Sequence, residues 1–82
     1  MALPPYQPVS CNFYDELEAL AVMHKSVEIT FKSELGAISK IRTTIRDFNI
    51  REGSEWLLTQ SGLEIRLDML VEVDGKHPVN YC

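Results

Sequence analysis

The chain has few of the residues that mark several large classes of protein. Two cysteines among 82 residues are too few for a disulfide scaffold, and the four glycines form no phosphate-cradling motif. No run of residues approaches the length of about 18 apolar residues that a transmembrane helix needs. The N-terminal residues have neither the basic start nor the apolar stretch of a signal peptide. We therefore expect a cytoplasmic protein that is not inserted in a membrane.

Basic residues are also in the minority. Lys and Arg number 8 against 12 Asp and Glu, which gives a net charge of −4. Because phosphate binding is driven by Lys and Arg, this balance argues against a DNA partner and against a surface that grips nucleic acid throughout. The charge is uneven, since residues 1–24 contain three acids and no base, whereas residues 25–51 contain six bases and three acids. An acidic first third therefore precedes a basic middle.

No constellation of catalytic or metal-binding residues is present. His24 and His77 have no partner at the spacing of metal ligands, and neither cysteine lies in a C-x-x-C pair, so we expect no metal site and no cofactor. Cys11 precedes a predicted helix, a position that can activate a thiol, but no histidine is evidently placed to act as its base. Asp15 and Glu18 share an exposed helix face that offers no cleft for acid–base chemistry. These features favour a small binding module over an enzyme.

The N-terminal third predicts an extended arm followed by a helix. Three of the four prolines lie in residues 1–11, where they favour an extended backbone. Asn12 is a good N-cap, with Ser10 as the competing cap, so the pattern predicts a helix over residues 12–24. The 3.6-residue period places Phe13, Leu17, Leu20 and His24 on the buried face, and Asp15, Glu18 and Val22 on the opposite side.

After the helix the hydrophobic period changes from 3.6 to 2, which is typical of half-buried strands. We expect strands at residues 26–32, 37–46, 56–60, 63–68 and 69–73. The alternation of the second strand is interrupted, with Ile38 on one phase and Ile41 and Ile45 on the other, which predicts a bulge. Residues 47–54 are expected to form a polar loop, or a short strand around Phe48 and Ile50. The predicted fold is mostly β (α+β): a single domain over residues 1–82 in which residues 26–73 form a small Sm-like β-barrel of about five strands, with an N-terminal helix and a tail at residues 74–82.

One segment resembles the opening of a known family. Rho-binding antiterminators, the Rof proteins, begin with the pattern Tyr-x-Pro-(Ile/Val)-x-Cys-x-x-Tyr-Asp-x-Leu-Glu. Every fixed position of that pattern is filled here, by Tyr6, Pro8, Val9, Cys11, Tyr14, Asp15, Leu17 and Glu18. The segment Ile65-Arg66-Leu67-Asp68 is similar to a second family motif, Leu-Arg-Leu-Asp. The resemblance covers about Tyr6 to Val73, although Asn12 and Phe13 stand where many members carry acids.

This resemblance implies both a fold and a partner. Rof proteins are bacterial Sm-like barrels with an N-terminal helix. They bind the transcription terminator Rho, a hexameric RNA-dependent ATPase, at its primary RNA-binding sites and thereby block termination. The positions that match the family's contact residues are Cys11, Asn12, Tyr14, Asp15 and Glu18. Asp15 and Glu18 are expected to pair with bases of Rho, because a carboxylate-bearing helix competes electrostatically for a basic RNA site.

An alternative hypothesis uses the basic middle of the chain. Four basic residues together with Phe48 could form a patch for single-stranded RNA, in which an aromatic ring stacks a base: Lys40, Arg42, Arg46 and Arg51. The two hypotheses differ in the segment that carries binding. The acid-only residues 1–24 favour a basic protein partner, whereas residues 25–51 favour RNA.

Overall fold

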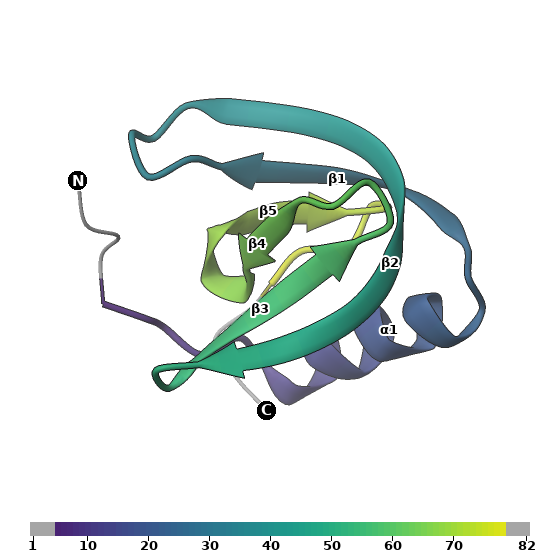
Figure 1. The fold of residues 1–82 in the computed structure, drawn as a ribbon, viewed down its shortest axis with the longest axis horizontal. Coiled ribbons are helices and arrows are strands. Elements are labelled where there is room, and N and C mark those ends of the chain that lie inside the picture. Colours follow the sequence, from purple (N-terminus) through teal and green to yellow (C-terminus); the bar gives the residue numbers. More distant parts are fainter. Residues whose placement is uncertain (1–4, 79–82) are drawn as a thin grey trace.

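A computed structural model describes residues 5–78, and it confirms a mostly β fold that begins with a helix (Figure 1). The helix α1 spans Cys11–Val22, and a 3-10 turn η1 (Leu67–Met69) joins the last two strands. The strands are β1 (Ser26–Lys32), β2 (Ile38–Arg51), β3 (Ser54–Thr59), β4 (Glu64–Arg66) and β5 (Leu70–Val73).

Helix α1 begins earlier and ends earlier than its sequence pattern predicts. Ser10, rather than Asn12, is the N-cap, because its buried hydroxyl accepts a hydrogen bond from the backbone N–H of Phe13 at 3.2 Å. At the other end, the N–H of His24 bonds Ala21 O and the N–H of Lys25 bonds Leu20 O. These bonds form a Schellman motif, in which His24 takes the left-handed conformation (φ 52°) that usually marks glycine.

The early end of α1 corrects one part of the predicted buried face. Phe13, Leu17 and Leu20 are buried as expected. His24, in contrast, lies beyond the last helical turn and is exposed, so its assignment to the buried face is wrong. A helical wheel places a residue correctly only as long as the helix continues.

Strand β2 continues through residues 47–51, part of the segment that was predicted to be a polar loop or to contain a short strand. Residues 47–51 pair with β3, so that only Glu52 and Gly53 form the turn between the two strands. Both turn residues have positive φ, 51° and 79°, as a two-residue hairpin turn of the primed type requires. A bulge is present, but it does not lie where the phase of the apolar residues changes. Ile38 to Thr44 pair with β1 in regular register, and the register shifts instead between Ile45 and Asp47, opposite β3.

The sheet is antiparallel, with the order β4-β3-β2-β1-β5. Its long strand β2 bends across the molecule, so that its first half pairs with β1 and its second half with β3 (Figure 1). Although η1 joins β4 and β5 directly, these two strands lie at opposite edges of the sheet. Within residues 5–78 they form no ladder with each other, so the sheet is not closed and the predicted barrel is met only loosely.

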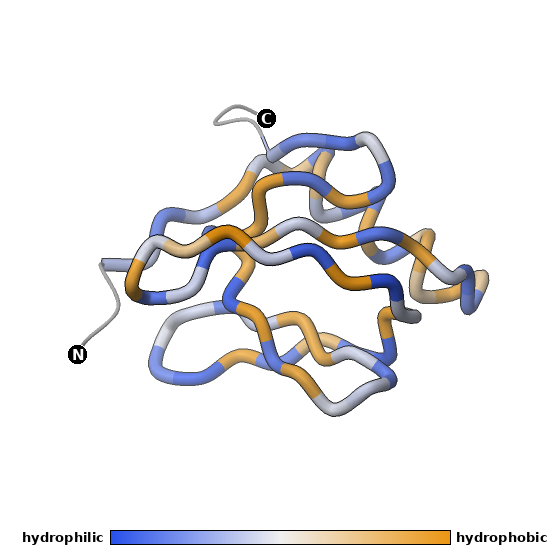
Figure 2. The backbone as a smooth tube through the Cα atoms, turned by 90° about the horizontal axis from the view of Figure 1, so that it is seen from above, coloured by the Kyte–Doolittle hydropathy of each residue, from blue (hydrophilic) through white to orange (hydrophobic). Residues whose placement is uncertain are grey.

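One hydrophobic core lies between α1 and the bent sheet. Apolar and polar residues alternate along the strands (Figure 2), which gives the sheet one apolar face. The core consists of Phe13, Leu17, Leu20, Val27, Ile29, Ile45, Leu57, Ile65, Leu67, Leu70 and Val73. Because α1 contributes three of these residues to the core, its opposite face is turned toward the solvent.

The N-terminal arm is joined to β4 and η1 by a cluster of four residues that we call the clasp: Tyr6, Gln7, Arg66 and Asp68. The Arg66 guanidinium donates two hydrogen bonds to the Asp68 carboxylate, at 2.6 and 2.8 Å. Asp68 also accepts a hydrogen bond from the backbone N–H of Gln7 at 3.0 Å, and Arg66 lies 5.6 Å from the Tyr6 ring centroid. The two sequence motifs that suggested a family resemblance therefore meet in space.

Candidate functional site

The exposed face of α1 carries a straight stripe of side chains. Cys11, Asp15, Glu18 and Val22 are spaced by four, three and four residues, which aligns them along one side of a helix. All four are exposed, and none belongs to the core. Because the helix begins at Cys11, no acid lies in its first turn, so neither carboxylate is committed to the helix N-terminus. Asp15 and Glu18 are therefore available to a partner.

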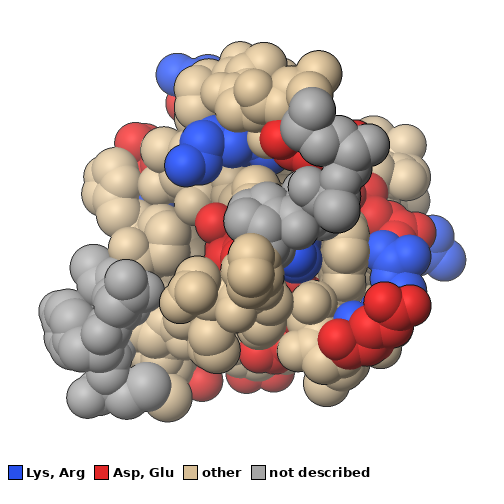
Figure 3. All heavy atoms as spheres, turned by 90° about the vertical axis from the view of Figure 1, so that its left-hand side faces the viewer, with Lys and Arg blue, Asp and Glu red and all other residues tan. Residues whose placement is uncertain are grey.

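Most of this stripe lines a shallow depression of about 400 Å³, which we call the acidic hollow. Its lining comprises Val9, Cys11, Tyr14, Asp15, Glu18 and Glu55. Four of the five residues expected to contact a partner thus come together, whereas Asn12 is exposed on α1 outside this lining. Glu55, on β3, was not predicted. Acidic side chains are visible along the lower edge of the face drawn in Figure 3, the side on which α1 lies in Figure 1.

Tyr14 lies among the carboxylates of the acidic hollow. Its ring packs against Phe48 on β2, with centroids 5.2 Å apart and planes tilted by 39°. Partial burial raises the pKa of Tyr14, and the carboxylates of Glu18, Glu55 and Asp47 raise it further. The acids that act on one phenol therefore come from α1, β3 and β2. The surface is broader than the helix alone.

A second depression of about 240 Å³ adjoins the first, because Glu18 lines both. We call it the apolar hollow, since Ala21, Val22 and Phe48 form much of its wall, together with Arg46 and Asp47. Arg46, one of the basic residues of the alternative hypothesis, thus lines the same depression as Glu18 and Asp47. The two hollows form one surface that extends along α1 and the β2–β3 hairpin.

Glu55 is held in place by the N-terminal arm. The Tyr6 hydroxyl donates a hydrogen bond to Glu55 Oε1 at 3.4 Å. Burial, followed by the negative charges of Glu55 and Asp68, raises the pKa of Tyr6 to about 12. Tyr6 therefore belongs to the clasp and also contacts a carboxylate of the acidic hollow.

This perturbed phenol gives a pH-dependence that can be measured. We expect an ultraviolet titration of tyrosinate to contain one transition near pH 12 that is absent from Tyr6→Phe. The folded-state pKa lies above the unfolded value of about 10. The contribution of neutral Tyr6 to the stability of the folded state is therefore complete below pH 10, and it is lost as the pH rises through about 12. If Tyr6→Phe lost stability in the same way over this range, Tyr6 would not be its source.

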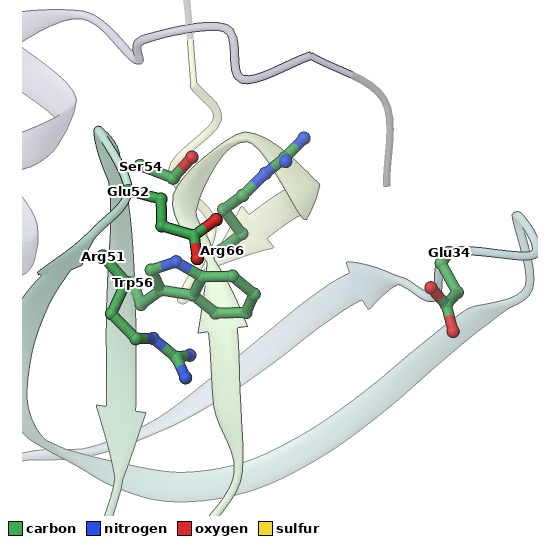
Figure 4. Close-up of a pocket in the computed structure, with 6 residues that line it drawn as sticks. All are labelled: Glu34, Arg51, Glu52, Ser54, Trp56 and Arg66. Carbon is green, nitrogen blue, oxygen red and sulfur yellow. The ribbon is translucent and has the colours of Figure 1, made fainter. Parts of the chain in front are cut away.

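The basic residues of the alternative hypothesis do not share one hollow. Lys40 Nζ lies 3.8 Å from Glu28 Oε1, and Arg42 is exposed two residues further along β2. Arg51, at the end of β2, pairs with Glu64 and stacks over the Trp56 ring at 4.3 Å (Figure 4).

A further depression of about 420 Å³ surrounds Trp56. Its lining comprises Glu34, Arg51, Glu52, Ser54, Trp56 and Arg66 (Figure 4). Glu34, on the β1–β2 turn, stands apart from the other five. Both arginines already have carboxylate partners, Glu64 and Asp68, and Arg51 covers the Trp56 ring. This depression is therefore poorly suited to hold a phosphate or to stack a base.

Three further observations concern a nucleophile, metal ions and membranes in the described part of the chain. Cys11 is disulfide-bonded, so its sulfur is not a free nucleophile. Among residues 5–78, no three or more His, Cys, Asp or Glu side chains are grouped so that they could hold a metal ion. No helix in the described range is long and apolar enough to span a membrane.

Sequence reasoning assigned neither Asp47 nor Glu55 to a site, and it placed Phe48 only in the alternative RNA-binding patch. All three lie on β2 or β3, within or next to residues 47–54, which were expected to form a polar loop. A signal was present, because Glu52-Gly53 occupies the place of a two-residue turn between segments that contain apolar residues.

Searches against protein-family models, curated proteins and solved structures found no match to this chain.

Proposed function

We propose that this protein is a non-enzymatic, cytoplasmic inhibitor of Rho-dependent transcription termination. It binds Rho at or near its primary RNA-binding sites and blocks the access of RNA. The observation that carries this proposal is the acidic surface around Tyr14, to which Asp15, Glu18, Glu55 and Asp47 contribute from three elements. The sequence resemblance of residues 6–18 to Rof proteins supports the identity of the partner.

The physical basis is competition between carboxylates and phosphates. A site that binds single-stranded RNA places positively charged side chains along the path of the RNA backbone. The same positive charge attracts an acidic protein surface. Exposed carboxylates accelerate association and exclude partners of like charge. The half-buried ring of Tyr14 adds a flat contact among these charges.

The test is a titration of purified Rho from the same organism with wild type and with Asp15→Lys/Glu18→Lys. We expect the double variant to bind at least about 100-fold more weakly, because two attractive contacts become repulsive. Glu16→Lys/Glu34→Lys is the matched control, since it makes the same change of net charge at exposed positions outside both hollows. This control should bind within about threefold of wild type.

Folding and redox state must be controlled in the same experiment. Both double variants should unfold within about 1 kcal/mol of wild type, because all four side chains are exposed. Disulfides are rare in the cytosol, so the titration is run with and without reductant. A wild type that does not bind Rho in either condition would show that the proposal is wrong.

RNA binding by the basic middle segment is a second candidate. Lys40 and Arg42 are exposed and lie two residues apart on β2, which places them on one face of the strand. This function predicts salt-dependent binding of single-stranded RNA that Lys40→Glu/Arg42→Glu abolishes and that Asp15→Lys/Glu18→Lys does not weaken.

A further inference from the structure

The outer stripe of α1 continues beyond its acids into an apolar end. Val22 and the adjacent Met23 are 78% and 61% exposed at the C-terminal end of the helix. A single exposed valine is ordinary on a protein surface. Here, however, Val22 lines the apolar hollow with Ala21 and the aromatic ring of Phe48. The exposed apolar side chain of Val22 therefore borders a depression rather than a convex surface.

The negative charge of the surface also decreases from the acidic hollow to the apolar hollow. The acidic hollow contains Asp15, Glu18 and Glu55, and no basic side chain lines it. The apolar hollow contains Glu18 and Asp47, but Arg46 offsets part of their charge. A cation is therefore attracted most strongly at the Asp15 end, and this attraction declines toward Val22. Along the axis of α1, Val22 lies about 6 Å beyond Glu18.

We propose that the surface has two parts and binds its partner in one direction. This inference rests on the proposed function and specifies the partner segment. The basic side chains of a basic protein segment lie in the acidic hollow. An aliphatic or aromatic side chain of the same segment packs against Val22 and Phe48. Charge complementarity orients the segment, and the apolar contact lengthens the lifetime of the complex.

Val22→Asp separates this inference from simple charge attraction. The substitution adds a negative charge, so attraction alone predicts unchanged or tighter binding to basic Rho. The apolar contact predicts the opposite, because burying the new carboxylate against an apolar side chain is unfavourable. We expect binding to weaken at least about tenfold, mainly through faster dissociation. Leu35→Asp is the matched control, since Leu35 is 73% exposed on the distant β1–β2 turn and should bind Rho like wild type.

An uncharged variant guards against a local effect of the new carboxylate on the helix. Val22→Ser removes the apolar surface without adding charge, and we expect it to bind about three- to tenfold more weakly. Circular dichroism should show unchanged helix content for both Val22 variants. Wild-type-like or tighter binding by Val22→Asp, with binding still lost in Asp15→Lys/Glu18→Lys, would overturn this inference and leave the proposed function in place. A wild type that does not bind Rho would overturn both.

Discussion

Replacing Asp68 by alanine is expected to lower the free energy of unfolding by about 3 to 5 kcal/mol. The side chains of Arg66 and Asp68 are only 6% and 8% exposed, and two hydrogen bonds join them. The substitution leaves the buried guanidinium without this carboxylate and removes the acceptor of the Gln7 N–H. Urea unfolding of the variant and wild type would measure the loss.

Two control variants test whether the loss of stability in Asp68→Ala comes from the burial of the ion pair or from the ion pair alone. Glu64→Ala breaks the pair with Arg51, in which both side chains are about half-exposed, and should cost less than about 1 kcal/mol. Arg66→Met/Asp68→Leu removes both charges and should recover much of the stability lost in Asp68→Ala. Equal losses for Asp68→Ala and Glu64→Ala would mean that the clasp is open to water in solution.

Replacing Leu17 by alanine is expected to destabilise the protein by about 2 to 5 kcal/mol. Leu17 is fully buried in the core formed by α1 and the sheet, so the truncated side chain leaves a cavity. For a domain of 82 residues this is a large part of the total stability, and partial unfolding at ambient temperature is expected. The measurement is again urea unfolding, with an unchanged m-value as evidence for a two-state transition.

The matched control for Leu17→Ala lies on the same helix. Val22→Ala also truncates an aliphatic residue of α1, but at an exposed position, and should change the free energy of unfolding by no more than about 0.5 kcal/mol. A loss below about 1 kcal/mol for Leu17→Ala would contradict the packing of α1 on the sheet.

Local patterns predicted the fold where a repeat decides the structure. Phe13, Leu17 and Leu20 follow the helical period, and Val27 and Ile29 follow the strand period, so the sequence alone indicated their burial. The patterns failed where the backbone takes an unusual conformation. His24 ends α1 in the left-handed region without being glycine. Glu52 begins a hairpin turn in which asparagine or aspartate would have been the clearer signal.

The candidate site was predictable to the extent that it is local. Asp15 and Glu18 share a helix face, and helical spacing alone brings such residues together. Glu55 and Asp47 reach the same surface only through the register of β2 with β3 and the packing of α1 against β2. That placement depends on contacts between residues that are distant in the sequence, which periodicity does not encode. The helix half of the surface was therefore found and the hairpin half was missed.

The clasp also sets an order of assembly during synthesis of the chain. It joins Gln7 to Asp68, a separation of 61 residues, and closing so long a loop costs chain entropy that only a formed sheet offsets. Helix α1 is synthesised before the strands β1 to β5, yet the arm that leads into it is anchored only after β4 and η1 have been made. Glu55 likewise enters the acidic hollow only after β3 has paired with β2. The acidic surface of α1 is thus completed only after β3 has been made, so that a nascent chain presents an acidic helix before it presents a binding site.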